Sequence, residues 1–335
     1  MSESYRVYRN TINRFLINFT LLFLILILAV TVSLTFGTTG FGYDSGSSVL
    51  KALIARLRFL RTTVAILTGG ALGVAGLVIQ TVVRNPLADP FLLGLSSTSL
   101  TFVALGFLLL PKVMVSKFFI FFLSFFGALV GYLMTVMLSR IGSMTATSLI
   151  LAGIAVTSFT SGISHLLIHL LYGISKFNLS YMLLGAISYA GWTDLYLLLA
   201  FIIPSFFLVL VCYKPLNAYL FGDTFLKQIG IELWQLTVFA SFISSLMTGI
   251  TIACVGVVGF VGLVSPHVAR HFVGSDHRFS IPASFVVGSI IMLISDITVR
   301  LIAYLSSGIG ELPVGVITSV IGAPFMSYIV IKKAR

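Results

Sequence analysis

The chain has 335 residues, of which 58% are hydrophobic and only 9% are charged. A soluble domain needs about a quarter charged residues to cover its surface, so this composition excludes an ordinary soluble protein. The formal net charge of +11 could suggest nucleic acid, but the basic residues lie scattered between apolar runs, which is typical of membrane anchoring, and we expect no nucleic-acid partner.

Continuous apolar runs of roughly 20 residues recur along the chain, and each is long enough to cross a lipid bilayer as a helix. We therefore predict an all-α, polytopic membrane protein with about ten transmembrane helices, forming a single transmembrane domain over residues 1–335. The first run is too long for the core of a signal peptide, so we expect it to be an uncleaved span. The predicted spans cover residues 15–36, 62–83, 91–110, 118–139, 147–171, 194–213, 232–252, 256–272, 281–304 and 314–331. The apolar fragment 179–190 is too short to span, and we expect it to be re-entrant.

One basic cluster opposes the orientation that the rest of the chain favours. An even number of spans puts both termini on one side, and the positive-inside rule places them in the cytoplasm. The cluster then falls outside, and it consists of Lys51, Arg56, Arg58 and Arg61. Two interpretations remain open: an acidic partner docks on the outer face, or the long side chains simply reach into the interface between bilayer and water.

A short polar island at residues 84–90 separates two long apolar runs. Asn85 precedes Pro86 and Asp89 precedes Pro90, and each pair is a helix-start signal, because the polar side chain can cap backbone donors and proline suits the first helical position. The two signals predict a rigid re-entry into the next apolar run. An ordinary turn between membrane helices is the alternative.

Glycines recur inside the predicted spans at spacings of three and four residues. That spacing puts them on one helix face, where the missing side chains let helices approach closely. Tight helix packing and a shaped pathway both remain open as explanations. The three groups are Gly69, Gly73 and Gly76; Gly127 and Gly131; and Gly256, Gly259 and Gly262.

Residues 213–231 form the longest polar interruption on the assigned cytoplasmic side. We expect Asp223 to cap a short helix that Gly230 ends. Phe225, Leu226 and Ile229 would form an apolar edge on that helix. Such an edge must rest on something, either the membrane surface or a cytoplasmic partner.

Few residue patterns in the chain suggest chemistry. Two histidine pairs are spaced i, i+4, which suits a metal on a helix face, but neither has an acidic or cysteine third ligand close in sequence, so we expect no metal site. The pairs are His165 with His169 and His267 with His271. Asp296 and Arg300 share this spacing and are expected to form an ion pair. No glycine-rich loop ends in Lys-Ser or Lys-Thr, so we do not expect the chain itself to bind ATP in that way, and no catalytic residues are predicted.

Several motifs resemble, in order, those of the iron-chelate and vitamin B12 uptake permeases known as the FecCD family. They are RNPLADP at 84–90, LGLSS at 93–97, GFVGLVSPHVAR at 259–270, GSDHR at 274–278, ELPVG at 311–315 and IGAP at 321–324. The resemblance covers nearly the whole chain. It implies the type II permease fold of an ABC importer, a homodimer of ten-helix subunits. Two ATP-binding subunits would bind it from the cytoplasm, and an extracytoplasmic substrate-binding protein would dock on the opposite face.

The resemblance also implies roles for individual residues. The loop 213–231 would carry the coupling helix that sits in a groove of the ATPase. The residues are Asp223, Phe225, Leu226, Ile229 and Gly230 for ATPase coupling; Arg58, Arg61 and Arg300 for docking of the binding protein; and Asn85, Leu87, Ala146 and Thr147 for the cytoplasmic gate.

The implied function is import of a metal chelate across the cytoplasmic membrane, with a ferric siderophore as the first candidate and cobalamin or haem as alternatives. The chain would be a transport subunit and not an enzyme, without a cofactor of its own, because ATP and Mg would be bound by the ATPase. A secondary transporter driven by an ion gradient is the alternative from another class. Such a carrier usually places several ionisable groups at mid-membrane, whereas Asp296 is the one clear candidate here.

Overall fold

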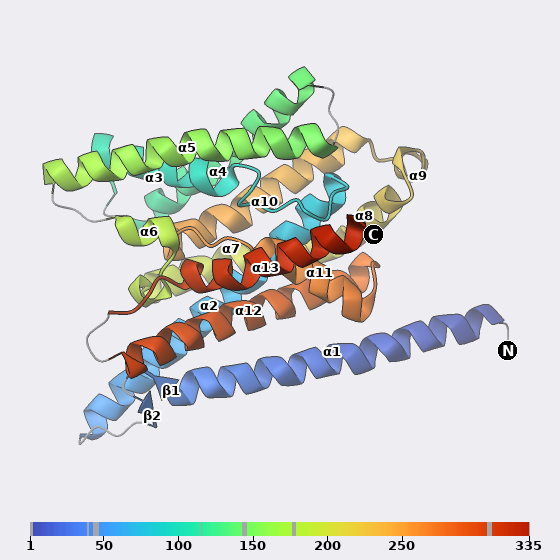
Figure 1. Ribbon diagram of the computed structural model, residues 1–335. Helices are drawn as coiled ribbons and strands as arrows, with labels where there is room; N and C mark the ends of the chain where they lie inside the picture. Colours follow the sequence, from blue (N-terminus) through green and yellow to red (C-terminus); the bar gives the residue numbers. More distant parts are fainter. Residues whose placement is uncertain are drawn as a thin grey trace.

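The computed structural model describes residues 3–38, 40–42, 47–114, 116–142, 146–175, 179–306 and 310–334. Within these ranges the chain forms a helical bundle with one short antiparallel pair of strands, Phe36–Gly37 and Gly40–Phe41 (Figure 1). The elements are α1 (Glu3–Thr35), β1 (Phe36–Gly37), β2 (Gly40–Phe41), α2 (Ser48–Val82), α3 (Leu95–Leu109), α4 (Lys117–Gly142), α5 (Ala146–Ser175), α6 (Ser180–Leu184), the 3-10 helix η1 (Ile187–Tyr189), α7 (Trp192–Val211), α8 (Tyr213–Leu220), α9 (Asp223–Gln228), α10 (Leu233–Val255), α11 (Val261–Val273), α12 (His277–Leu305) and α13 (Val314–Ala334).

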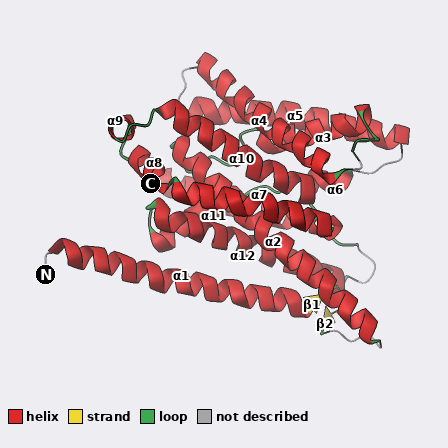
Figure 2. Cartoon of the chain, turned by 180° about the vertical axis from the view of Figure 1, so that it is seen from behind, coloured by secondary structure: helices red, strands yellow, loops and turns green. Residues whose placement is uncertain are grey.

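Helix α2 is the centre of the bundle. It packs against α12, α10, α11 and α7, while α3 packs against α4 and α5, and α10 joins the two groups by packing against both α2 and α4. Helix α1 lies along one edge of the bundle and α5 along the opposite edge (Figure 1, Figure 2). The strands and α6 lie at one end of the bundle, and α8 and α9 lie at the other end.

Across the described ranges, seven helices are long and apolar enough to cross a membrane. They are Phe15–Thr35, Ser48–Val82, Lys117–Ile141, Thr147–Ile174, Trp192–Val211, Leu233–Val255 and His277–Leu305. The other three predicted spans correspond to α3, α11 and α13, whose apolar helical segments are shorter. The polytopic helical fold is therefore confirmed, whereas the count of ten spans is not.

Helix α2 begins at Ser48, well before the predicted span at residue 62. The side chain of Ser47 accepts a hydrogen bond from the backbone N–H of Leu50 at 3.3 Å and caps the helix. Residues 48–68 contain neither glycine nor proline, so nothing interrupts the helix before the apolar run. The basic cluster from Lys51 to Arg61 consequently lies on α2 itself and not in a loop.

The predicted break between the seventh and eighth spans lies a few residues later than expected. Helix α10 continues to Val255 and ends at Gly256, whose φ of 88° is a conformation that favours glycine. The expectation that Gly256 and Gly259 share a helix face is wrong, because both lie in the loop before α11. The fragment 179–190 forms only α6 and η1, which are too short to span, as predicted.

The glycine face of α2 packs directly on the backbones of neighbouring helices. A Cβ added to Gly69 would overlap the carbonyl oxygen of Gly288 in α12, and one added to Gly76 would overlap the carbonyl oxygen of Gly262 in α11. The prediction of close packing is confirmed for this face, because only glycine allows backbones to approach so closely.

The polar island at residues 84–90 forms turns and no helix start. The Asn85 carboxamide oxygen accepts from the backbone N–H of Leu87 at 2.9 Å, which closes a turn in place of capping a helix. Helix α3 begins only at Leu95, after Gly94 with a φ of 82°. The helix-start prediction is wrong because asparagine before proline suits a turn as well as a helix cap. We call residues 84–90 the inner loop.

Candidate functional site

At the end of the bundle that carries the strands, Asp296 bridges two arginines. One carboxylate oxygen accepts from Arg61, with Nε at 2.8 Å and Nη2 at 2.7 Å, and the other pairs with Arg300 on the same helix. Arg61 also donates from Nη1 to both carboxylate oxygens of Glu311, at 2.7 and 2.8 Å. The predicted pair of Asp296 and Arg300 is confirmed. The sequence did not single out Glu311 as a partner of Arg61.

Arg58 and Arg300 are buried, with 6% and 1% of their surface exposed. Arg58 donates from Nη1 to the carbonyl oxygen of Thr35 at 2.6 Å, and Arg300 donates to those of Ser33 at 2.8 Å and Phe36 at 3.1 Å. These donors hold the end of α1 and strand β1 against α2 and α12. Their burial argues against direct contact with a partner in this conformation, and their docking role stays a prediction.

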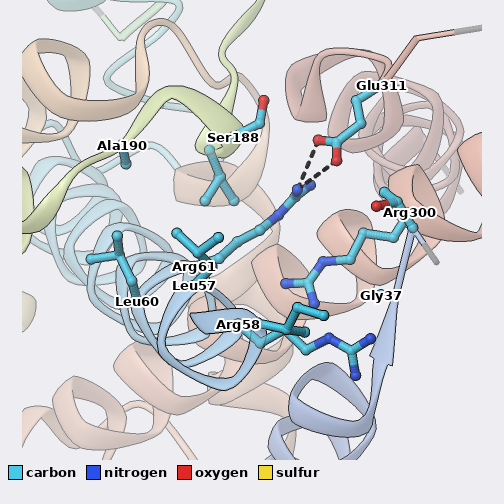
Figure 3. A pocket seen from close by; sticks show the side chains of 12 residues that line it. Gly37, Leu57, Arg58, Leu60, Arg61, Ser188, Ala190, Arg300 and Glu311 are labelled. Atoms are coloured by element: carbon cyan, nitrogen blue, oxygen red, sulfur yellow. Dashed lines mark hydrogen bonds and ion pairs between the residues drawn. The ribbon is translucent and has the colours of Figure 1, made fainter. Parts of the chain in front are cut away.

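The three predicted docking arginines line one cavity of about 300 Å³. Figure 3 shows Arg61 extending toward Glu311, whereas Arg58 and Arg300 lie toward the strand that carries Gly37. Arg61 is the one whose guanidinium faces a partly exposed partner, since the Glu311 side chain is 26% exposed.

A larger cavity of about 800 Å³ shares Glu311 with the first. The rings of Tyr181 and Tyr189 line it and stack with centroids 4.4 Å apart. Ser180 and Ser188 also line it, beside the apolar residues Leu184, Ala186 and Pro313. The lining is therefore mainly apolar, and Glu311 is its one charged residue among those that the structure describes.

At the opposite end, α9 presents two of the three predicted edge residues to solvent. Phe225 and Ile229 are each 50% exposed, whereas Leu226 is fully buried and anchors the helix to the bundle. The prediction that Leu226 belongs to an exposed edge is therefore wrong, because the short helix needs one apolar side chain to hold it down. Phe221, which was not predicted, extends the edge with 73% exposure.

The start of α9 differs from the prediction, whereas its end agrees with it. Gly222, and not Asp223, occupies the cap position, and the Asp223 carboxylate instead accepts from Arg84 at 2.9 Å. Gly230, with a φ of 77°, follows the helix as predicted, and its N–H donates to the carbonyl oxygen of Lys227 at 2.9 Å.

The four predicted gate residues lie in two segments. Asn85 and Leu87 lie in the inner loop, and both are partly exposed. Ala146 and the exposed Thr147 begin α5, where the hydroxyl of Ser148 donates to the carbonyl oxygen of Ser139 at 3.1 Å and ties α5 to the end of α4. The side chain of Ala146 lies outside the described part of the chain, and the gate role of all four residues stays a prediction.

The inner loop is fixed to α11 by Asp89, whose side chain is 2% exposed. The backbone N–H groups of Phe91 and Phe260 donate to its carboxylate. Burial nevertheless raises the pKa of Asp89 to about 7. Because Phe260 precedes α11, this carboxylate joins the loop between α2 and α3 to the start of another helix.

Replacing Asp89 with asparagine should remove a pH dependence of stability. A carboxyl group whose pKa is raised in the folded chain stabilises the fold when protonated, and this contribution is lost as pH rises through 7. We expect the natural chain to lose about 2–3 kcal/mol between pH 5 and pH 8 through this residue. Thermal unfolding of the detergent-purified chain at both pH values measures the loss. An Asp89→Asn variant with the same pH dependence as the natural chain would contradict the assignment.

The two predicted histidine pairs lie on different helices, α5 and α11. His165 and His169 are exposed on α5, and His165 Nδ1 lies 2.7 Å from the carbonyl oxygen of Ser161. No cluster of three or more histidine, cysteine or acidic side chains occurs among the residues that the structure describes. One histidine that the spacing argument passed over, His277, links three helices through Thr81 Oγ1 at 2.8 Å and Asn217 Oδ1 at 2.7 Å.

Comparison with known proteins shows the family to which this chain belongs. The sequence model of the FecCD transport family matches residues 16–332 of this chain. The chain belongs to the FecCD transport family. This FecCD chain is 31% identical over 288 residues to the Fe(3+) dicitrate transport system permease protein FecC of Escherichia coli (strain K12), covering 84% of each protein. It is 30% identical over 317 residues to the vitamin B12 import system permease protein BtuC of Salmonella typhi, covering 93% of this chain and 94% of that one.

Solved structures agree with the family on the fold. The FecCD chain superposes with a TM-score of 0.78 and 25% identity on a metal-chelate type ABC transporter in an inward-facing conformation, covering 94% of this chain and 99% of that one. It shares the fold alone, at 18% identity and a TM-score of 0.59, with PsaBC from Streptococcus pneumoniae in complex with Fab, covering 80% and 89%. The chain is thus a multi-pass permease subunit of the ABC importer class in the cell membrane, which is a transport subunit and not an enzyme.

Proposed function

We propose that this permease moves a ferric siderophore across the cytoplasmic membrane, with cobalamin and haem as the alternative cargoes. The observation that carries the proposal is the near-equal similarity to an iron-citrate and a vitamin B12 permease over most of the chain. Both relatives are named for large metal chelates. The cavity of about 800 Å³ lined by Tyr181, Tyr189 and Ser188 would suit a bulky cargo that must be held weakly and released.

The permease would work as a homodimer with two ATP-binding subunits, which bind ATP and Mg. Phe225 and Ile229 would insert into a groove of each ATPase, because half-exposed apolar side chains at the end of a membrane bundle need a cover. Leu226 would hold α9 in place from beneath. Both termini would then lie in the cytoplasm, since they lie on the same side as α9 in an even-span topology.

A soluble binding protein would dock at the end that carries the strands. Arg61 is the arginine best placed to receive a carboxylate of that partner, because Glu311, which now occupies it, is partly exposed and can be displaced. Arg58 and Arg300 would support the docking surface from within. Asn85, Leu87, Ala146 and Thr147 would close the pathway at the cytoplasmic end.

The charge pairing supports ATP-driven import over an ion-driven carrier. Asp296 is engaged by two arginines, and the buried Asp194 pairs with Lys117 at 3.1 Å. An ion-coupled carrier needs carboxylates that bind and release protons or sodium during each cycle. Carboxylates held by cations are poorly suited to that task. Asp89 is buried without a cation, but it lies in the inner loop and not in a helix that spans the membrane.

A binding screen on the partner binding protein tests the proposed cargo. Ferric hydroxamate and ferric catecholate siderophores, cobalamin and haem are titrated side by side, with the iron-free siderophores as matched controls. We expect one ferric siderophore to bind at least about tenfold more tightly than cobalamin or haem, a difference of about 1.4 kcal/mol. Tight binding of cobalamin or haem without binding of any ferric siderophore would contradict the proposal.

A further inference from the structure

Helix α2 ends in a backbone motif that normally requires glycine. The N–H of Arg84 donates to the carbonyl oxygen of Thr81 at 3.2 Å, and the N–H of Asn85 donates to that of Gln80 at 3.1 Å. This pair of bonds is the Schellman motif, whose left-handed position is usually glycine. Here the position is occupied by Arg84, with a φ of 52°. A side chain is disfavoured in this conformation, so its presence calls for a reason.

The side chain of Arg84 reaches the segment that would couple to the ATPase. Its Nη2 donates to the carbonyl oxygen of Tyr219 in α8 at 3.0 Å and to the carboxylate of Asp223, the first residue of α9, at 2.9 Å. Its guanidinium carbon also lies 4.0 Å from the centroid of the Tyr219 ring. A planar guanidinium can stack on the ring while its N–H groups donate in the plane, an arrangement that suits arginine better than lysine.

Stability does not explain these contacts. The side chains of Arg84 and Asp223 are 45% and 50% exposed. Ion pairs exposed to this degree contribute little to folding, because water screens them and both side chains lose freedom. A glycine at position 84 would relieve the backbone. It would remove an exposed ion pair and the partly buried contacts with Tyr219.

The inner loop continues the connection to another helix. The Asn85 side chain closes a turn on Leu87, and the N–H of Ala88 donates to the carbonyl oxygen of Asn85 at 3.1 Å. Asp89 then accepts from the N–H of Phe260, next to the start of α11. An ion pair and hydrogen bonds therefore connect α9 to the inner loop and the inner loop to α11.

We propose that Arg84 is a positioning residue that transmits movement of α9 to the inner loop. The proposal rests on the proposed function, in which α9 contacts the ATPase and the inner loop forms part of the gate. When the ATPase displaces α9, Asp223 and Tyr219 pull on the Arg84 guanidinium. The strained backbone at the end of α2 then moves with the loop, and Leu87 moves with it.

Spin labels on the gate test this inference without knowledge of the cargo. Position 87 carries a label through Leu87→Cys in the complete complex in liposomes, and the distance between the labels of the two copies is measured with and without the non-hydrolysable analogue AMP-PNP. The nucleotide should change that distance distribution in the parent complex. Arg84→Gly should weaken the nucleotide-dependent population shift by about fivefold or more, while thermal stability and copurification of the ATPase stay unchanged.

Two further variants separate the possible outcomes. Asp223→Asn leaves the loop backbone untouched and should weaken the shift in the same direction, whereas Arg84→Lys should restore part of it relative to Arg84→Gly. A parent-like shift in Arg84→Gly and Asp223→Asn would overturn the inference. A loss of thermal stability in Arg84→Gly, with a parent-like shift in Asp223→Asn, would also overturn it by making the role structural.

A third variant separates this inference from the proposed function. Phe225→Asp should release the ATPase from the complex, because it places a charge on the exposed edge of α9. If Phe225→Asp releases the ATPase while Arg84→Gly keeps the parent-like shift, only the role of Arg84 is wrong. If the ATPase remains bound to Phe225→Asp, the coupling role of α9 fails, and with it the premise of the inference.

Discussion

Replacing Asp296 with alanine should lower the stability of the folded chain by about 3–5 kcal/mol, because it leaves a buried arginine without its counter-ion. Arg300 is 1% exposed, and its remaining acceptors are the carbonyl oxygens of Ser33 and Phe36 and the hydroxyl of Ser33. These acceptors are neutral and cannot offset the charge. Thermal unfolding in detergent measures the effect, and the end of α1 should lose protection from hydrogen exchange first.

Two controls show whether burial is the cause. Asp223→Ala removes the carboxylate of an exposed ion pair and should change stability by less than about 1 kcal/mol. The double variant Asp296→Leu with Arg300→Leu removes both buried charges and should recover much of the loss. If Asp296→Ala unfolds at the temperature of the natural chain, then Asp296 does not hold together the end of the bundle that carries the strands.

Replacing Gly76 with alanine should cost about 3 kcal/mol or more, at the upper end of what overpacking costs. The added Cβ would overlap the carbonyl oxygen of Gly262, which belongs to the α11 backbone and cannot rotate away. Gly262 itself lies against Asp89 and Pro90, so separating the two helices would also disturb the inner loop. The expected result is poor folding yield and a large drop in unfolding temperature.

Gly162 provides the matched control for this substitution. It also lies within a long helix, α5, but nothing lies within 4 Å of a Cβ placed on it. Gly162→Ala should be neutral or stabilising by about 0.5–1 kcal/mol, because alanine favours a helix. Equal effects of Gly76→Ala and Gly162→Ala would mean that α2 and α11 are not in backbone contact.

The close packing of α2 also bears on how the two ends of the bundle communicate. Helix α2 carries Arg61 at the end of the bundle that carries the strands and leads directly into Arg84 at the end that carries α9. At Gly69 and Gly73 its backbone lies directly against the backbone of α12, and at Gly76 against that of α11. Because these backbones are in contact, we expect a displacement of α2 to move α11 and α12 with it.

The sequence predicted those features that depend on spacing along one helix. Helical periodicity predicts both the pairing of Asp296 with Arg300 and the packing face of Gly69 and Gly76. Both predictions hold because the residues lie within continuous helices in the folded chain. The membrane class follows from composition and the family from motifs in order. Helix spacing, composition and motifs can each be read from the sequence without knowing which distant segments meet in the fold.

The sequence failed where one residue type serves two local structures or where distant segments meet. Asn85 before Pro86 fits a turn as well as a helix cap, and only the hydrogen bond to Leu87 decides between them. Leu226 is buried because the bundle lies beneath α9, which periodicity in a six-residue helix cannot show. Arg61 pairs with Glu311, a residue 250 positions away, and no local sequence pattern predicts this pairing.

Uptake into liposomes tests whether this chain is the permease of an ATP-driven chelate importer. The complete complex is reconstituted with ATP inside, the binding protein outside, and an iron-55 ferric siderophore chosen by the binding screen. We expect uptake that requires internal ATP and the ATPase and that persists when ionophores collapse the proton and sodium gradients. Uptake that continues without the ATPase and stops with the ionophores would contradict the account.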